Sequence, residues 1–324
     1  MSIKKYSIIS TAFLLLILPV IYNLNPHARA NPFPDRYINL NPLAHEIKNG
    51  GFSIFPIIGG WGEFGKYSSS ASDFEHNYNA KLGVAAEFFR YKNLLTLMVS
   101  SDIELVANPR SEINFNPRSF FWQEGFIFIY NFNYFYGQIG YIHRCKHDID
   151  NLEILDEEGE RKERVIIYDS ILLKFVSRKL NLLGHEFFPL ETILFLRGDF
   201  FVYTDDDIIW SVEPGLKERS SFNNLKTSFQ FGLTTDLIKY EFFALYFKGQ
   251  YAINIFTYGD SNSNKTFGAS SYVFEMGLSI MGGGGRMNLF FNYEYQYDTA
   301  INPYRENAHL LLIGLRIYDN RVYY

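Results

Sequence analysis

Cysteine is nearly absent from this 324-residue chain, which contains only Cys145, so a disulfide scaffold is excluded. The chain also has no large excess of charge of either sign, because 30 basic and 35 acidic residues leave a net charge of −5. No basic face is available to neutralise a phosphate backbone, and nucleic acid is not expected as a partner. After residue 30, no run reaches the roughly 18 apolar residues of a membrane-spanning helix. A membrane role would therefore require strands.

The first thirty residues predict a secretory signal peptide. Lys4 and Lys5 form a positive region, Ile8 to Tyr22 an apolar region, and Ala28 to Ala30 an A-x-A cleavage site. A single anchor helix is the alternative, and it is disfavoured because the apolar run is short for a bilayer. Residues 31–50 are rich in Pro and Asn, which predicts a periplasmic tether or a segment that enters a lumen. Residues 51–324 form the main predicted domain.

Alternation of apolar and polar residues with a period of two recurs through this domain, as β-strands require. Between Met287 and Asp298, five apolar or aromatic residues alternate with Asn, Glu, Gln and Asp. The pattern predicts about twelve strands, near 52–66, 78–90, 94–106, 120–131, 134–147, 163–177, 189–204, 224–237, 240–256, 270–281, 286–298 and 308–318. A strand of this kind has one apolar face and one polar face that contacts water.

Strand length and aromatic placement favour a membrane barrel over a soluble β-sandwich. The predicted strands run about 11 to 16 residues, against a usual mode of 5 to 6 in globular proteins, and aromatic residues make up 18% of the chain and crowd the strand ends as interfacial girdles do. Short turns, such as Lys239-Tyr240 and Gly282–Gly285, alternate with long polar loops, such as 205–223 and 257–269. We therefore expect a single antiparallel barrel in the outer membrane, with short turns periplasmic and long loops outside.

Charges on the polar faces are expected to line the lumen, because Arg or Lys at the lipid midplane costs about 2 to 4 kcal/mol. The clearest of these residues are Lys226, Lys248, Glu294 and Arg197. A barrel of about twelve strands lies between side-chain-filled and open types, so small or no conductance is expected.

Reactive residues gather at the outer end of the fifth predicted strand, in His143-Arg144-Cys145-Lys146-His147-Asp148-Ile149-Asp150. Alternation places His143, Cys145 and His147 on one wall, which faces either lipid or lumen. In a catalytic interpretation, Cys145 attacks, His143 or His147 is the base, and Asp148 or Asp150 orients it. In a metal interpretation the three residues are ligands, but no partner motif appears elsewhere. The third interpretation is a structural network at the rim.

Two resemblances accompany this segment. His143-x-Cys145 is similar to the His and Ser that outer-membrane phospholipases and lipid A deacylases place two residues apart near the outer rim, with Cys in place of Ser. The longer segment from His143 to Asp150, with the strand beginning at Arg164, resembles an uncharacterised bacterial outer-membrane barrel family with a His-x-Ser-x-His-x-Gly-Asp motif. That resemblance implies fold and location; no activity comes with it.

Three functions stay open on the sequence alone: a structural or narrow transport barrel with a partly filled lumen, a lipid acyl hydrolase at the rim, and a surface-binding protein that uses its outer loops. Asp205 to Asp207, in a predicted outer loop, suggest either a divalent-cation contact with lipopolysaccharide or a solvated loop. Outer-membrane lipid or lipopolysaccharide and the barrel-assembly machinery are the expected partners, and no cofactor or resident metal is predicted.

Overall fold

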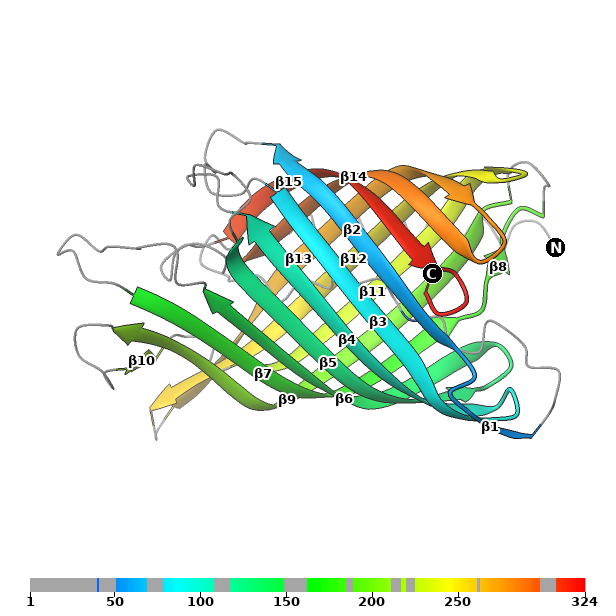
Figure 1. Cartoon of the computed structure of the whole chain (residues 1–324). Helices are drawn as coiled ribbons and strands as arrows, with labels where there is room; N and C mark the ends of the chain where they lie inside the picture. Colours follow the sequence, from blue (N-terminus) through cyan, green and yellow to red (C-terminus); the bar gives the residue numbers. More distant parts are fainter. Residues whose placement is uncertain are drawn as a thin grey trace.

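The computed structural model describes residue 40 and residues 51–68, 78–107, 117–148, 162–184, 189–210, 217–219, 225–260, 263–297 and 307–323. Within these residues, twelve long strands form an antiparallel ring (Figure 1). They are β2 (Ile58–Ser68), β3 (Tyr78–Tyr91), β4 (Leu95–Ala107), β5 (Pro117–Asn131), β6 (Phe135–Asp148), β7 (Lys162–Ser177), β9 (Glu191–Trp210), β11 (Leu225–Tyr240), β12 (Phe243–Asp260), β13 (Ser263–Met281), β14 (Gly285–Tyr297) and β15 (Asn307–Asp319). The predicted all-β barrel of about twelve strands is confirmed.

The ring closes because the last strand pairs with the first long one. Tyr318 on β15 lies opposite Trp61 on β2, and every other long strand pairs with its neighbours in chain order. Three short strands add to this ring: β1 (Phe52–Ile54) pairs with the end of β3, and β8 (Leu180–Asn181) and β10 (Lys217–Arg219) pair with β9. Closure leaves no unpaired edge among the long strands. An unpaired edge would expose backbone polar groups to lipid without hydrogen-bond partners.

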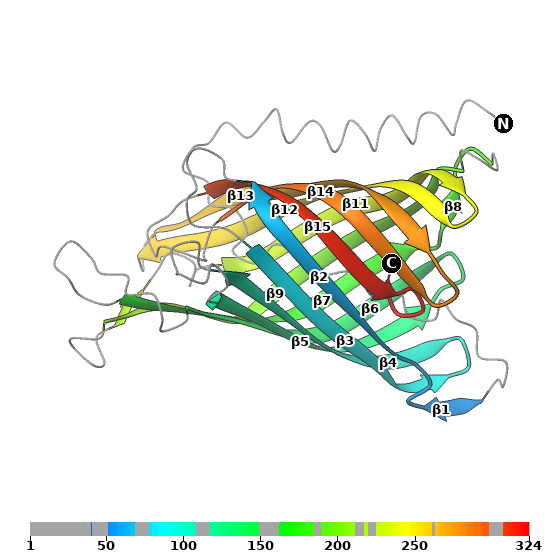
Figure 2. The ribbon, with the colours of Figure 1, turned by 45° about the horizontal axis from the view of Figure 1, so that its top comes forward.

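Tight turns lie at one end of the barrel, together with the chain's C-terminal end (Figures 1 and 2). The predicted turn at Gly282–Gly285 is confirmed, with the amide of Gly282 donating to the carbonyl of Gly285 at 2.9 Å. The turn predicted at Lys239-Tyr240 lies instead at Glu241-Phe242, because the ladder continues to the pair Tyr240–Phe243. Short connections mark this end as the periplasmic one.

Several strands continue further outward than the sequence predicts. β9 runs to Trp210, and its Asp205 pairs with Ile167 of β7. The three aspartates from Asp205 therefore lie in a strand, and the prediction that a loop starts at residue 205 is wrong. β12 and β13 pair as far as Asp260 and Ser263, which removes most of the predicted loop at 257–269. Antiparallel pairing satisfies backbone hydrogen-bonding groups outside the membrane as well as inside it. Because of this, the strands continue through the polar residues at which the sequence predicted that they would end.

Side chains alternate between an apolar outer wall and a polar inner wall. On β14, Leu289 is 56% exposed and Phe291 48%, while Asn292 and Glu294 are buried in the interior. Lys248, Arg197 and Glu294 are likewise interior, as predicted. Lys226 is exposed instead, because a register shift between Leu225 and Thr227 moves it off the inner face.

Charges on the inner wall bind one another in a belt. The Arg316 guanidinium contacts both Glu275 and Glu63 at 2.6 Å, and Lys81 lies 3.1 Å from Glu63 and 3.9 Å from Glu104. All five side chains are buried. The belt thus joins strands β13, β15, β2, β3 and β4 through alternating positive and negative groups.

A second interior network completes much of the circumference. Asp199 on β9 accepts bonds from Arg197 at 2.6 Å, Arg144 at 3.3 Å and Ser170 at 3.0 Å. Arg144 also donates to Gln123 at 2.7 Å. Each buried charge here has an opposite charge within contact, which is the arrangement that makes burial tolerable.

The described part of the chain contains no helix of the length and apolarity needed to cross a membrane.

Candidate functional site on the outer wall

A row of polar side chains interrupts the apolar outer wall across five neighbouring strands. In register order these are Ser101 on β4, Glu124 on β5, His143 on β6, Asp169 on β7 and Tyr203 on β9. Residues directly opposite in antiparallel strands have Cβ atoms about 4.5 to 5.5 Å apart. The row therefore forms a continuous polar stripe on the outer wall.

The outward direction of this stripe follows from its neighbours along each strand. Ile139 and Tyr141 share the face of His143 and are 56% and 40% exposed, whereas Arg144 and Lys146 point to the interior and are buried. The wall that carries His143 and Cys145, undecided from sequence, is thus the outer one.

His143 and Asp169 form the central contact of the row. The Nδ1 atom of His143 lies 2.6 Å from Oδ1 of Asp169, and the two side chains are 36% and 17% exposed. Hydrogen bonding at Nδ1 to a carboxylate places the donated proton on that nitrogen and leaves Nε2 as the acceptor when the ring is neutral. The imidazole is therefore oriented as a base with its free nitrogen available.

Cys145 lies two residues beyond His143 on the same strand. Its cross-strand neighbours are Trp122 on β5 and Ile167 on β7, and it is 7% exposed. Among the described residues, no hydrogen bond reaches its thiol, which is free of any disulfide. Residues two apart on a strand have Cα atoms about 6.5 to 7 Å apart, which the side chains of His and Cys can span.

The remaining predicted site residues lie at or beyond the described limits. The backbone of His147 pairs with Phe120 and Val165, but its side chain and that of Asp148 are outside the description, and so is Asp150. The part of the catalytic prediction that uses them stays a prediction. The carboxylate that orients the His143 ring in the structure is Asp169.

Sequence reasoning missed Asp169 and Glu124 as members of this site. Both break the apolar side of an alternating strand: Glu124 stands between Trp122 and Phe126, and Asp169 between Ile167 and Ile171. The sequence signal that could have identified them is a carboxylate at a position that alternation assigns to the apolar face of the strand. Within the residues that the structure describes, no three His, Cys, Asp or Glu side chains gather as a metal ion requires.

No protein-family model and no curated protein matches the chain in sequence. Similar solved structures include the outer membrane phospholipase A from Escherichia coli, with 11% identity and a TM-score of 0.44 over 83% of this chain and 98% of that chain. The Salmonella typhi outer membrane phospholipase dimer with bound calcium has 11% identity and a TM-score of 0.46 over 86% and 95%. The Ralstonia pickettii toluene transporter TbuX has 9% identity and a TM-score of 0.37 over 85% and 90%.

These similarities concern barrel architecture and carry nothing about activity. Location follows from the molecule's own polarity, because a closed ring of long strands with an apolar exterior and a polar interior suits a lipid surround. The chain is an outer-membrane β-barrel.

Proposed function

We propose that this barrel hydrolyses acyl esters of membrane lipids at its outer wall, with Cys145 as nucleophile, His143 as base and Asp169 as the group that orients it. The observation that carries the proposal is the 2.6 Å contact between His143 and Asp169 on the lipid-facing side, two residues from the only thiol. A base oriented by a third group beside a nucleophile is the arrangement of covalent acyl transfer.

The cost of placing charges on this wall supports a function for them. Charged side chains on the lipid face destabilise a barrel, by about 0 to 1 kcal/mol near the edges of the apolar band and by more toward its middle. The interior of this barrel already accommodates many charges in pairs, whereas Glu124, His143 and Asp169 lie outside. Structural stability alone gives no reason for the outward position.

The position along the strand suits lipid esters. His143 lies eight residues beyond Phe135, where β6 begins. At about 3.4 Å per residue and a tilt of about 40°, this is about 21 Å above the periplasmic end, against an apolar band about 25 Å tall. The site thus lies near the outer edge of the band, where acyl chains are esterified to their head groups.

The chemistry proceeds in two transfers. Cys145 gives its proton to Nε2 of His143, and the thiolate attacks the ester carbonyl; the alkoxide leaving group then takes the proton from Nε2, which leaves a thioester on Cys145. Water then gives a proton to Nε2 and attacks the thioester, and the fatty acid leaves as the thiol is reprotonated. Asp169 holds the Nδ1 proton and stabilises the imidazolium formed in each transfer. Attack requires the thiol to rotate out of its packed position.

The test is fatty-acid release from phospholipid vesicles that contain the refolded barrel. We expect Cys145→Ala to abolish release, His143→Ala and Asp169→Asn to lower kcat/KM by about 10² to 10⁴-fold, and Cys145→Ser to retain part of it. His309→Ala is the matched control, because His309 is also an exposed histidine of the outer wall, with Nδ1 2.7 Å from the hydroxyl of Tyr293. Absence of hydrolysis by the parent barrel, or full activity of Cys145→Ala, would overturn the proposal.

The interior supports a second candidate, a structural barrel with a closed lumen. The observation that favours it is the belt in which Arg316, Lys81 and three glutamates neutralise one another. Single-channel recording in planar bilayers separates this candidate from a transport role, because large and stable openings would contradict it. Binding through outer loops and assembly by the barrel-assembly machinery stay predictions.

A further inference from the structure

The chain turns back into the barrel after its last strand. β15 ends at Asp319, and the four residues Asn320–Tyr323, here called the C-terminal hook, form a tight turn. The amide of Tyr323 donates to the carbonyl of Asp319 at 3.0 Å, and Arg321 binds the Asp319 carboxylate at 2.6 Å. The hook is thus held in one direction by its own hydrogen bonds.

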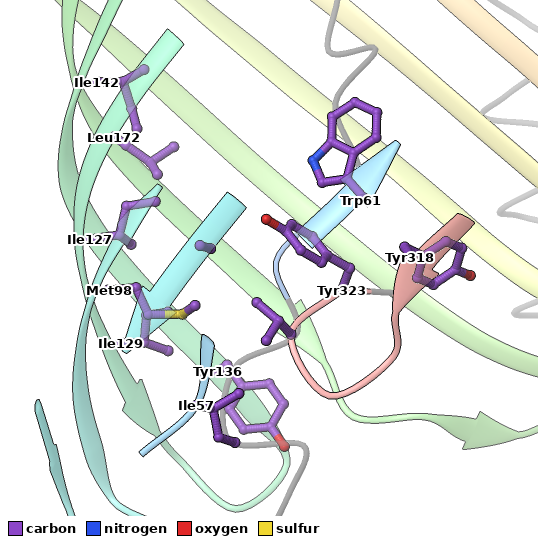
Figure 3. Close-up of a cluster of buried hydrophobic side chains, with 12 residues drawn as sticks. Ile57, Trp61, Met98, Ile127, Ile129, Tyr136, Ile142, Leu172, Tyr318 and Tyr323 are labelled. Carbon is purple, nitrogen blue, oxygen red and sulfur yellow. The ribbon is translucent and has the colours of Figure 1, made fainter. Parts of the chain in front are cut away.

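Two side chains of the hook are buried inside the periplasmic end of the lumen. Val322 and Tyr323 are each 1% exposed. They pack in an apolar cluster whose other members come from the strands on both sides of Tyr323 and from the segment before β2, as Figure 3 shows: Ile57, Trp61, Ala85, Met98, Ile127, Ile129, Tyr136, Ile142, Leu172 and Tyr318. The cluster therefore covers the inner wall from β15 through β2 to β7.

Leu40, from the segment before the barrel domain, also contributes to this cluster. Leu40 pairs with Tyr323 in an antiparallel bridge and packs against the same side chains. Two residues far apart in the sequence thus meet within the periplasmic mouth.

Ring closure does not depend on the hook. The ladder between β15 and β2 runs from the pair Leu311–Ser68 to the pair Tyr318–Trp61 and is complete before Asn320. The barrel wall nevertheless makes room for the hook, since a Cβ atom added at Gly59 would lie 2.6 Å from Cγ2 of Val322. Glycine at this position permits the close approach of the hook to β2.

We infer that the C-terminal hook is a stopper that seals the periplasmic mouth of the lumen. Polar residues of the inner wall begin at the border of the cluster: Ser100 is next along the inward face of β4 from Met98, and only Gly125 separates it from Ile142 in register. A mouth lined by that wall would admit water and small polar solutes, whereas an apolar cluster built around Val322 and Tyr323 excludes them. The stopper is independent of the proposed hydrolase, which lies on the opposite side of the wall.

The test measures access to a thiol placed behind the stopper. In a Cys145→Ser background, Ser100→Cys provides a single, nearly isosteric thiol in the interior, and its labelling by a membrane-impermeant maleimide is timed in the refolded barrel. We expect slow labelling with the hook intact. Labelling should become at least tenfold faster in a chain that ends at Asp319 and in the full-length variants Val322→Asp and Gly59→Val.

Controls keep the result decisive. Asn320→Gln changes an exposed hook residue outside the cluster and should label as slowly as the parent, and circular dichroism with protease resistance confirms that each barrel is folded. If the shortened chain does not fold, the two full-length variants decide. Rapid labelling with the hook intact, or equally slow labelling in folded hook variants, would overturn the inference.

Discussion

The two walls of this barrel treat charge in opposite ways. On the inner wall, Arg316 lies between Glu63 and Glu275, and each charge is neutralised by a neighbour. On the outer wall, a polar row crosses an apolar surface, and its central pair, His143 and Asp169, is in contact at 2.6 Å. Inner charges are explained by their partners, whereas the outer row requires an explanation beyond stability. That difference distinguishes the structural part of the molecule from its candidate site.

The largest expected effect breaks the inner belt. Arg316→Leu leaves Glu275 and Glu63 buried without their shared cation, and should lower the free energy of unfolding by about 3 to 5 kcal/mol. Guanidinium unfolding in lipid vesicles, followed by tryptophan fluorescence, measures it. Arg321→Leu is the control, because the Arg321 side chain is 49% exposed beside Asp319 and an exposed pair is worth about 1 kcal/mol or less. Equal losses in the two variants would contradict the belt's structural role.

A smaller effect comes from adding a charge to the outer wall. Met276 is 50% exposed on β13, and Met276→Lys should destabilise the barrel by about 2 to 4 kcal/mol near the lipid midplane. Lys248→Leu, on the inner wall opposite Glu275, should cost less because Glu275 keeps its contact with Arg316. The same unfolding assay compares them. If both variants were tolerated equally, the assignment of inner and outer walls would be wrong.

The smallest stability effect is expected within the polar row itself. Glu124→Gln and Asp169→Asn remove outward carboxylates near the outer edge of the apolar band, and each should change the free energy of unfolding by about 1 kcal/mol or less, because a lipid-face charge costs little at that depth. Asp169→Asn should still lose hydrolysis, because the amide does not hold the imidazole in its active tautomer. A loss of stability as large as that of Arg316→Leu would instead assign the row a structural role.

The strands and their walls could be predicted because period-two alternation is local. Leu289, Asn292 and Glu294 take the faces that their spacing indicates. The pairing of His143 with Asp169 could not be predicted, because it depends on the register between β6 and β7, which are separated by a long connection. Lys226 shows the same limit on a smaller scale, since one register shift between Leu225 and Thr227 moves it off the inner wall.

The most direct test of the outer-wall site is a search for acyl transfer to Cys145. The refolded barrel is incubated with phospholipid vesicles and quenched in acid, and peptides are analysed by mass spectrometry. We expect Cys145 to carry the mass of a lipid acyl chain in a thioester that hydroxylamine removes, and the adduct to be missing in His143→Ala and present in His309→Ala. Lipid hydrolysis without any acyl group on Cys145, or an adduct that forms equally in His143→Ala, would contradict the proposed mechanism.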